Sequence, residues 1–345
     1  MKKLYTLTTL CLFISLGLFA QDFSTLYKNM SPSVVTIMVK EHHARASNNS
    51  RGVSMVSSEG LGSGVLINDK GDIWTAAHVV LLAEEVVVHF ASGEQIPAKV
   101  ITTNATADVA LIRLIWMPKK YTVAKIAPSS EVNIGDNIFI IGAPFGLERS
   151  LSVGYISGRL KEKGQQYAFS KSEYFQTDAS INHGNSGGPM FNTKGECIGI
   201  VSSILSQSGG FDGIGFVVTS DICRLHLEGN QPFWYGAEFQ VIGGELRTIF
   251  NLPQEMGLLV QKVAAGSPAA LSGLRPGIYK SNIEGNELLT GGDIIIKIGD
   301  FVVEPKMDMD AIEDYLAMLK PNQVFYITVL RAGAEVKLTG VVPGK

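Results

Sequence analysis

Short apolar runs separated by turn residues dominate the chain up to about residue 226. Val, Ile and Leu gather in brief stretches, and Gly, Asn, Asp and Ser fill the intervals, a pattern typical of β-strands joined by tight turns. Helical periodicity is scarce here, which favours a β-barrel or sandwich. Residues 41–59 (EHHARASNNSRGVSMVSSE) are polar and small, so we expect a loop there. The predicted strands are residues 33–40, 62–68, 85–90, 109–115, 137–141, 195–202 and 213–218.

The pattern changes after this point. Residues 227–234 are predicted to be a linker, and one clear helix is expected at residues 308–319, where it starts with an acidic residue and ends before Pro321. The strands expected around it are residues 237–242, 258–263, 293–298 and 324–330. At 345 residues the chain can hold two folding units, and we predict them at residues 21–226 and 235–345.

The N-terminus has the pattern of an export signal. Lys2 and Lys3 precede an apolar stretch at residues 4–19, and Ala20 is a small residue before polar Gln21. We expect residues 1–20 to be a signal peptide cleaved after Ala20. The alternative is an uncleaved inner-membrane anchor formed by residues 4–20 of a periplasmic protein.

Composition excludes some function classes. With 18% charged residues and a formal net charge of −3, the chain lacks the basic excess of a nucleic-acid-binding protein. After removal of a leader, Cys197 and Cys223 remain, and two buried thiols are favoured over one disulfide. No nucleotide-binding loop or metal motif is present, and the adjacent His42 and His43 are expected in a solvated loop, so no cofactor is expected.

Three stretches have the residue types of nucleophilic catalysis. They are WTAAHVV around His78, DVALIRL beginning at Asp108, and QTDASINHGNSGGP around Ser186. A serine hydroxyl needs a neutral imidazole to take its proton, and a carboxylate to hold the imidazole in the right tautomer. The glycines allow a tight turn in which the amides of Gly184 and Ser186 can point at one developing oxyanion.

GNSGG also fits the G-x-S-x-G elbow of α/β-hydrolases. In those enzymes the serine precedes the acid and the histidine along the chain, at a strand-to-helix turn. Here Pro189 and a strand-like run follow Ser186, and the order is His78, Asp108, Ser186, as in the chymotrypsin type. We therefore predict a serine-protease triad.

On these stretches, together with GSGVLI, IGAPFGL and GIGFVV, the chain resembles the HtrA/Deg family of exported trypsin-like serine proteases, in its DegS/DegP-like form with one PDZ domain. The resemblance implies an all-β-dominated fold: a chymotrypsin-like double β-barrel followed by an α+β PDZ domain. It implies general base, orienting acid and nucleophile roles for His78, Asp108 and Ser186, and an oxyanion hole at Gly184 and Ser186. Ile181, Ile204 and Leu205 would line an aliphatic specificity pocket.

The resemblance extends to the C-terminal part. Trp234, Tyr235, Gly236 and Ala237 stand where a PDZ carboxylate-binding loop is expected, and PDZ modules add a peptide C-terminus as an extra strand. Ile312 and Tyr315 or Leu316 would face the groove, or belong to the core. His183 replaces a common proline, and we expect it to be a loop residue.

The family implies an ATP-independent endopeptidase of the cell envelope. Its substrates would be misfolded proteins or a membrane-bound regulator, its activator hydrophobic C-terminal peptides, and its assembly a homotrimer, with no nucleic acid. Phe23, Leu26 and Tyr27 resemble the residues through which the family forms trimers, although packing on their own barrel would explain them as well. The competing class is a PDZ-type peptide-binding or chaperone protein with little proteolysis.

Overall fold

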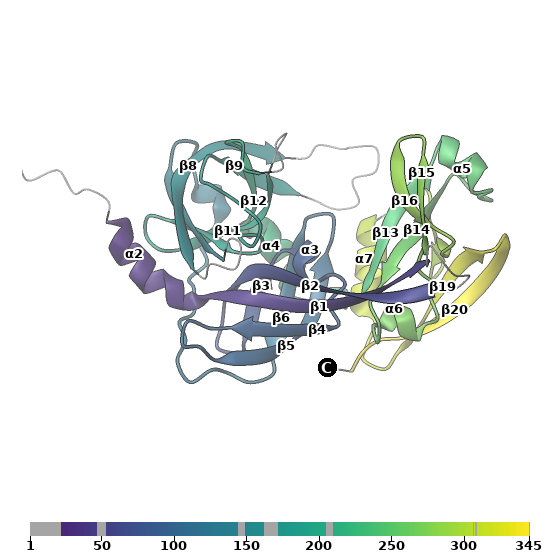
Figure 1. Ribbon diagram of the computed structural model, residues 1–345, viewed down its shortest axis with the longest axis horizontal. Helices are drawn as coiled ribbons and strands as arrows, with labels where there is room; N and C mark the ends of the chain where they lie inside the picture. The colour runs from purple at the N-terminus through teal and green to yellow at the C-terminus, as the bar shows by residue number, and fades with distance from the viewer. Residues whose placement is uncertain are drawn as a thin grey trace, which may run out of the picture.

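The computed structural model describes residues 22–46, 53–143, 149–161, 172–204, 210–305, 307 and 309–344. Their strands form two closed six-stranded barrels, one open sheet and one two-stranded hairpin. Figure 1 shows the two barrels side by side, with the open sheet and hairpin as a C-terminal unit beside them. The prediction of a mostly-β, chymotrypsin-like double barrel is confirmed.

The first barrel has the strand order β1-β2-β3-β6-β5-β4. Ile37, Val88 and Ile112 are fully buried inside it, from three different strands. The strands are β1 (Val34–Ala46), β2 (Val53–Leu66), β3 (Asp72–Thr75), β4 (Glu85–His89), β5 (Gln95–Asn104) and β6 (Val109–Leu114).

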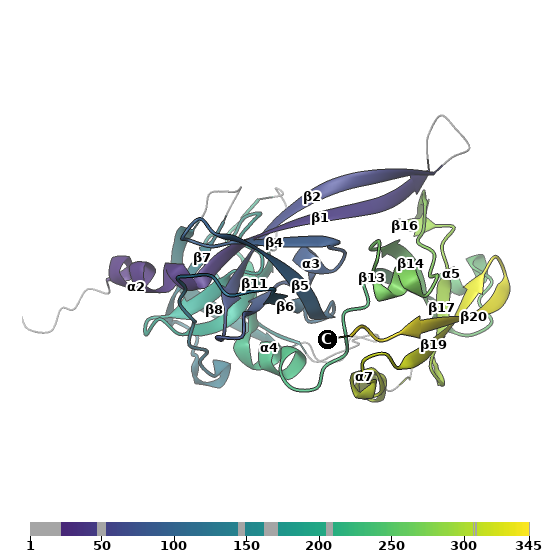
Figure 2. The same ribbon diagram turned by 90° about the horizontal axis from the view of Figure 1, so that it is seen from below.

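β1 and β2 continue beyond the barrel as a two-stranded ribbon. Their antiparallel pairing runs without interruption from Val34–Val65 to Ala46–Val53. The prediction of a loop over residues 41–59 was therefore wrong for residues 41–46 and 53–59. The ladder hydrogen bonds hold the ribbon together, and without a barrel core to face, its sequence needs no apolar alternation. Figure 2 shows the ribbon reaching toward the C-terminal unit.

The second barrel has the strand order β10-β11-β12-β9-β8-β7. Ile140, Phe175 and Val217 are fully buried in its core. A further buried cluster joins the two barrels and includes Trp74 from the first and Phe191 from the second. The strands are β7 (Asn137–Gly142), β8 (Ser150–Lys161), β9 (Glu173–Thr177), β10 (Pro189–Asn192), β11 (Cys197–Ile204) and β12 (Gly215–Thr219).

The C-terminal unit is a sheet of order β13-β14-β17-β19-β20, with β18 paired to β17. Its core includes Val260, Ile295 and Phe325. Residues 279–290 form a separate hairpin. The strands are β13 (Ala237–Gly243), β14 (Met256–Val263), β15 (Tyr279–Ile283), β16 (Asn286–Thr290), β17 (Ile294–Ile298), β18 (Phe301–Val302), β19 (Val324–Arg331) and β20 (Ala334–Val341).

The helices are short, and none within the described ranges is long and apolar enough to cross a membrane. They are α2 (Phe23–Met30), α3 (Ala77–Val80), α4 (Ser220–Leu227), α5 (Glu245–Ile249), α6 (Pro268–Leu271) and α7 (Met309–Met318), with 3-10 turns at Ser31–Ser33 and Ser129–Glu131. α7 is the helix expected at residues 308–319. The predicted signal peptide lies outside the described residues.

Phe23 and Tyr27 of α2 pack on the chain's own second barrel. The Phe23 ring meets Phe139 edge-on with centroids 5.9 Å apart, and the Tyr27 hydroxyl donates to the Arg149 carbonyl at 2.7 Å. The side chain of Asp22 caps the helix by accepting from the amides of Ser24 and Thr25. In this single chain α2 is thus a cover for the barrel.

Candidate active site

His78 and Asp108 are brought together by the pairing of β3 with β6. In this antiparallel ladder Thr75 lies opposite Ala110. His78 stands three residues after Thr75, on the single turn of α3, and Asp108 stands two residues before Ala110. The first barrel therefore places the imidazole and the carboxylate at one end of the same strand pair.

The carboxylate of Asp108 holds the imidazole of His78 in one orientation. Nδ1 of His78 lies 2.9 Å from both Oδ1 and Oδ2 of Asp108, and the His78 amide donates to Oδ1 at 3.1 Å. With Nδ1–H donated to this carboxylate, the neutral ring presents Nε2 as its free base. Asp108 has φ +55°, a left-handed conformation that aspartate tolerates better than most residues.

The electrostatics of His78 follow from two opposed influences. Burial is the largest single one and lowers the pKa of the imidazole, because it disfavours the charged form. The hydrogen bond and the negative charge of Asp108 act in the opposite direction, and their sum raises the pKa of His78 above its ordinary 6.5. The imidazolium is thus stabilised beside Asp108, as a general base requires once it has taken a proton.

Ser202 is a second residue that bonds to the Asp108 carboxylate, and the sequence patterns did not predict it. Its hydroxyl donates to Asp108 Oδ2 at 2.5 Å, and the residue is 6% exposed. Ser202 lies in the apolar run CIGIVSSI of β11. A serine inside such a run was the available signal, because a buried hydroxyl needs a hydrogen-bond partner.

Ser186 lies against the first barrel just before β10. Its carbonyl accepts from the Ser63 amide at 2.8 Å, and the Gly187 amide donates to the Val201 carbonyl at 2.7 Å. Gly187 has φ +81°, and a Cβ on it would meet Thr75 Oγ1 at 2.2 Å and the Ser63 carbonyl at 2.3 Å. This close approach seats the serine beside the end of β3, the strand that leads to His78.

The hydroxyl of Ser186 donates to the Ser202 carbonyl, at 3.4 Å. Among the described residues Ser186 makes no hydrogen bond to His78, so the two side chains must come closer before a proton can pass between them. Side-chain rotations take picoseconds to nanoseconds in exposed residues, and catalytic hydrogen bonds tighten when substrate binds. Ser202 therefore contacts both ends of the arrangement, through its hydroxyl and its carbonyl.

The turn before Ser186 has the features expected of an oxyanion hole. Gly184 has φ +99°, its carbonyl accepts from the Ser63 hydroxyl at 2.7 Å, and the Asn185 amide donates to the Asn182 carbonyl at 3.0 Å. Within the described part of the chain, the amides of Gly184 and Ser186 donate to no other group. Two unengaged amides with one residue between them are the donors that a tetrahedral oxyanion needs.

Comparison with known proteins places this geometry in a family. A model of the trypsin-like peptidase domain matches residues 62–200. A probable periplasmic serine endoprotease, DegP-like, of Ectopseudomonas mendocina is 31% identical over 293 residues, covering 83% of this chain and 60% of that protein. The protein of the same description in Pseudomonas putida strain F1 is 30% identical over 329 residues, covering 85% and 68%. The chain belongs to the HtrA family of serine proteases.

Solved structures of the family share the fold. A variant of the HtrA-type protease AlgW with a decapeptide aligns with TM-score 0.54 at 25% identity, covering 93% of this chain and 97% of that one. AlgW itself with a decapeptide aligns with TM-score 0.51 at 25% identity, covering 93% and 98%. The chain spans between 60% and 68% of the length of the two curated relatives above.

In this HtrA chain two of the three predicted specificity residues, Ile181 and Ile204, fall in one apolar cluster. Ile181 is buried at the centre of the second barrel's core, and Ile204 packs against the same cluster. A Cβ on Gly215 would lie 2.5 Å from Ile181 Cδ1, so the isoleucine fills the space above that glycine. Leu205 lies outside the described residues. His183 is exposed.

The predicted carboxylate-binding loop lies where β13 begins. Gly236 has φ +77°, and a Cβ on it would meet Ser267 Cβ at 2.3 Å. Tyr235 packs into the C-terminal core, where its hydroxyl shares a hydrogen bond with Ser272 at 3.0 Å and burial raises the pKa of the phenol to about 12. Trp234 donates its backbone amide to the Ile101 carbonyl and its indole N–H to the Leu81 carbonyl, so it docks on the first barrel.

The residues predicted to face the peptide groove from α7 pack against other residues of the C-terminal unit. Ile312 is buried, and the ring of Tyr315 packs on Phe301 with centroids 5.7 Å apart. β13 is the terminal strand of its sheet in the described chain and pairs only with β14. Its free edge could still accept an added strand.

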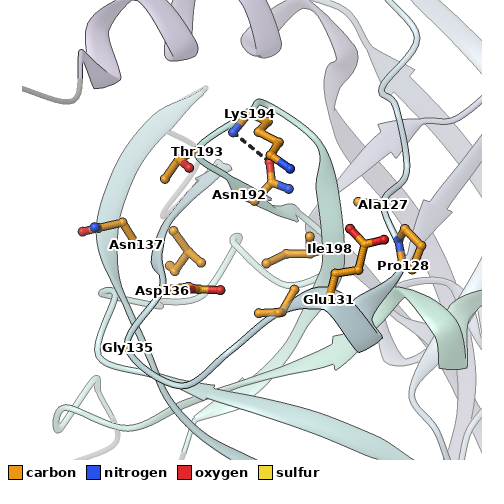
Figure 3. A pocket seen from close by; sticks show the side chains of 12 residues that line it. Ala127, Pro128, Glu131, Gly135, Asp136, Asn137, Asn192, Thr193, Lys194 and Ile198 are labelled. Carbon is orange, nitrogen blue, oxygen red and sulfur yellow. Dashed lines mark hydrogen bonds between the residues drawn. The ribbon is translucent and has the colours of Figure 1, made fainter. Parts of the chain in front are cut away.

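Two cavities lie away from these residues. One, of about 280 Å³, is on the second barrel, where side chains of Glu131, Asp136 and Lys194 line it from three segments (Figure 3). The other, of about 290 Å³, lies between α4, the linker and α7.

Among the described residues no group of three or more His, Cys, Asp or Glu side chains could hold a metal ion. His42 instead bonds through Nδ1 to Glu84 Oε2 at 2.8 Å, from a strand rather than the predicted solvated loop.

Proposed function

We propose that this protein is an ATP-independent serine endopeptidase of the cell envelope. One observation carries the proposal: the Asp108 carboxylate holds His78 and Ser202 together, while Ser202 in turn holds Ser186. Ser186 attacks the scissile carbonyl, and Nε2 of His78 takes its proton and later gives it to the leaving amine. The amides of Gly184 and Ser186 stabilise the oxyanion.

The substrates are misfolded or signalling proteins that already expose extended apolar segments. The aliphatic cluster of Ile181 and Ile204 favours a small apolar side chain at the cleaved position.

Residues 227–234 act as a linker, and residues 235–345 form a PDZ domain that captures hydrophobic C-terminal peptides. The free edge of β13 supports strand addition, and the positive φ of Gly236 supports a tight loop for the peptide carboxylate. Peptide binding would regulate the protease. Solved structures of the HtrA-type protease AlgW hold a decapeptide.

The protein is exported to the periplasm, as the names of its relatives indicate for those proteins. N-terminal sequencing of the native protein distinguishes cleavage after Ala20 from retention of residues 4–20 as an inner-membrane anchor. A homotrimer is the expected assembly, and sedimentation equilibrium tests it. A soluble quality-control enzyme would have the cleaved terminus, and a signalling protease the anchored one.

Cleavage of denatured casein by the wild type and by Ser186→Ala tests the proposal. We expect cleavage by the wild type and by the control Ser92→Ala, an exposed serine in the turn between β4 and β5. Ser186→Ala should be inactive. If the wild type is as inactive as Ser186→Ala, with and without hydrophobic C-terminal peptides, the protein is a peptide-binding or chaperone protein instead.

A further inference from the structure

The four residues that follow the His78 helix are held by Trp234, the last residue of the linker, and by Ala265 of the C-terminal unit. α3 is a single turn, Ala77–Val80, and its C-cap is Leu81. The indole N–H of Trp234 donates to the Leu81 carbonyl at 2.8 Å. Three residues further on, the Glu84 carboxylate accepts from the backbone amide of Ala265 at 3.1 Å. Residues 81–84 are therefore held at both ends.

Glu84 also ties this segment to the ribbon of β1 and β2. Its carboxylate accepts from the His42 amide at 3.1 Å and lies 2.8 Å from the His42 ring nitrogen. The Glu84 amide donates to the Lys40 carbonyl at 2.9 Å. One carboxylate thus joins the segment after α3, the strand β1 and the C-terminal unit.

Of the two residues that hold this segment, Trp234 belongs to the proposed carboxylate-binding loop, and Ala265 follows a residue that bonds to that loop. Trp234 stands two residues before Gly236, the glycine of that loop. Ala265, the donor to Glu84, follows Ala264, whose amide donates to the Gly236 carbonyl at 2.9 Å. The Ala269 amide donates to the Tyr235 carbonyl at 3.0 Å. A displacement of this loop would therefore move both contacts to residues 81–84.

From these contacts we infer that Trp234 is a positioning residue for His78. Through Trp234, the binding of a peptide at the loop of residues 235–237 changes the orientation of α3. The inference rests on the proposed function and adds to it the route by which a bound C-terminal peptide reaches the catalytic base. Its ligand class is a peptide with a free α-carboxylate.

The physical reason is the shortness of α3. A single helical turn is not stable by itself, so its orientation depends on tertiary contacts. The last carbonyls of a helix lack partners within it, and Trp234 satisfies the one on Leu81. The same turn carries the His78 amide and ring that bond to Asp108. A looser α3 therefore weakens the bond that raises the pKa of His78.

Trp234→Phe tests the inference because it removes the indole N–H and keeps an aromatic ring. Trp116→Phe is the matched control, a 55% exposed tryptophan on the first barrel. We expect Trp234→Phe to lower kcat on casein about threefold to tenfold with little change in KM, the range that one lost hydrogen bond spans. The acidic midpoint of its pH profile should move down, toward the ordinary histidine pKa. Glu84→Gln should act in the same direction, and its control Glu85→Gln should not.

Hydrogen exchange of residues 77–84 in the Ser186→Ala chain gives a readout that needs no turnover. The probe is a decapeptide ending in Ala-Leu-Val, with its C-terminal amide as the control, and fluorescence anisotropy measures binding. We expect the free-acid peptide to change exchange in this segment, and Trp234→Phe to remove most of that change. A purely structural role would alter exchange equally with and without peptide.

Two outcomes overturn the inference: binding of the acid peptide without any change in exchange, or the same change in Trp234→Phe as in its parent. Absence of binding overturns it as well, together with the proposed peptide capture, whatever the casein assay shows. If casein is not cleaved but the peptide response is present and depends on Trp234, the proteolysis fails and the coupling stands.

Discussion

The Ser202 hydroxyl donates to Oδ2 of Asp108 at 2.5 Å, on the carboxylate that also orients His78. We predict that Ser202→Ala lowers kcat/KM on casein about tenfold to a hundredfold, because a hydrogen bond to a charged group is worth about 1.5–3 kcal/mol. Ser203→Ala is the matched control, because Ser203 is the next residue in the strand and is exposed. Full activity of Ser202→Ala, or an equal loss in Ser203→Ala, would contradict the role given to Ser202.

The raised pKa of His78 predicts opposite pH trends for activity and stability. The base must be neutral, so kcat/KM should fall on acidification through a midpoint above 6.5, the ordinary histidine value. The protonated ring is favoured beside Asp108, so its stabilising contribution is fully present below the unfolded pKa. That contribution is lost as pH rises through the folded pKa.

The measurement pairs casein kinetics with urea unfolding between about pH 5 and 8. His78→Gln should remove the part of the pH dependence of unfolding that belongs to this pair. Activity that persists unchanged at pH 4 would show that His78 is not the base.

Gly187→Ala should destabilise the protein and abolish activity. The added Cβ would lie 2.2 Å from Thr75 Oγ1 at a residue with φ +81°, and the backbone around it is buried. Gly93→Ala is the matched control, because Gly93 has φ +85° but nothing within 4 Å of the new Cβ. The control isolates the conformational effect, which costs about 1–2 kcal/mol. Equal losses of unfolding free energy in the two variants would contradict the close packing of Ser186 against β3.

The two described cysteines should be inert in the native protein. Cys197 and Cys223 are free and buried, as the sequence analysis predicted, and burial raises the pKa of Cys197 to about 12. We expect no alkylation by iodoacetamide at pH 8 until the protein is denatured, and two labelled sites afterwards, as counted by mass spectrometry of peptides from residues 22–345. Rapid labelling of the native chain at either residue would contradict the packing of this core.

The candidate triad could be predicted because its signals are local. Each of His78, Asp108 and Ser186 lies in a short sequence motif, and the residues next to it in the chain are typical of its catalytic role. Ser202 could not be found in this way, because its partner Asp108 lies 94 residues away and only the closed barrel brings them together. Trp234 was predicted in a peptide-binding loop, but nothing local indicates that its indole reaches Leu81, 153 residues earlier.

The fold was predictable where strands face a core. Strands that lie outside a core, or that expose their apolar residues, were not predicted. β8 was not predicted, and its apolar residues Leu151, Val153 and Tyr155 are exposed rather than part of the core. The ribbon at residues 41–46 and 53–59 extends beyond the barrel core, and its strand pairing is stabilised by backbone hydrogen bonds. The N-cap of α2, Asp22, is visible in the sequence, but the eight residues of the helix are too few to show a clear helical periodicity of apolar residues.

The central claim is that His78, oriented by Asp108, activates Ser186. Labelling with a fluorophosphonate tests it most directly: Ser186 Oγ bonds to phosphorus, fluoride leaves, and the proton passes to His78. Mass spectrometry should find the adduct on Ser186 in the wild type, with the labelling rate reduced at least about a hundredfold in His78→Ala. A wild-type rate in His78→Ala, or an adduct on another serine with Ser186 unmodified, would contradict the account.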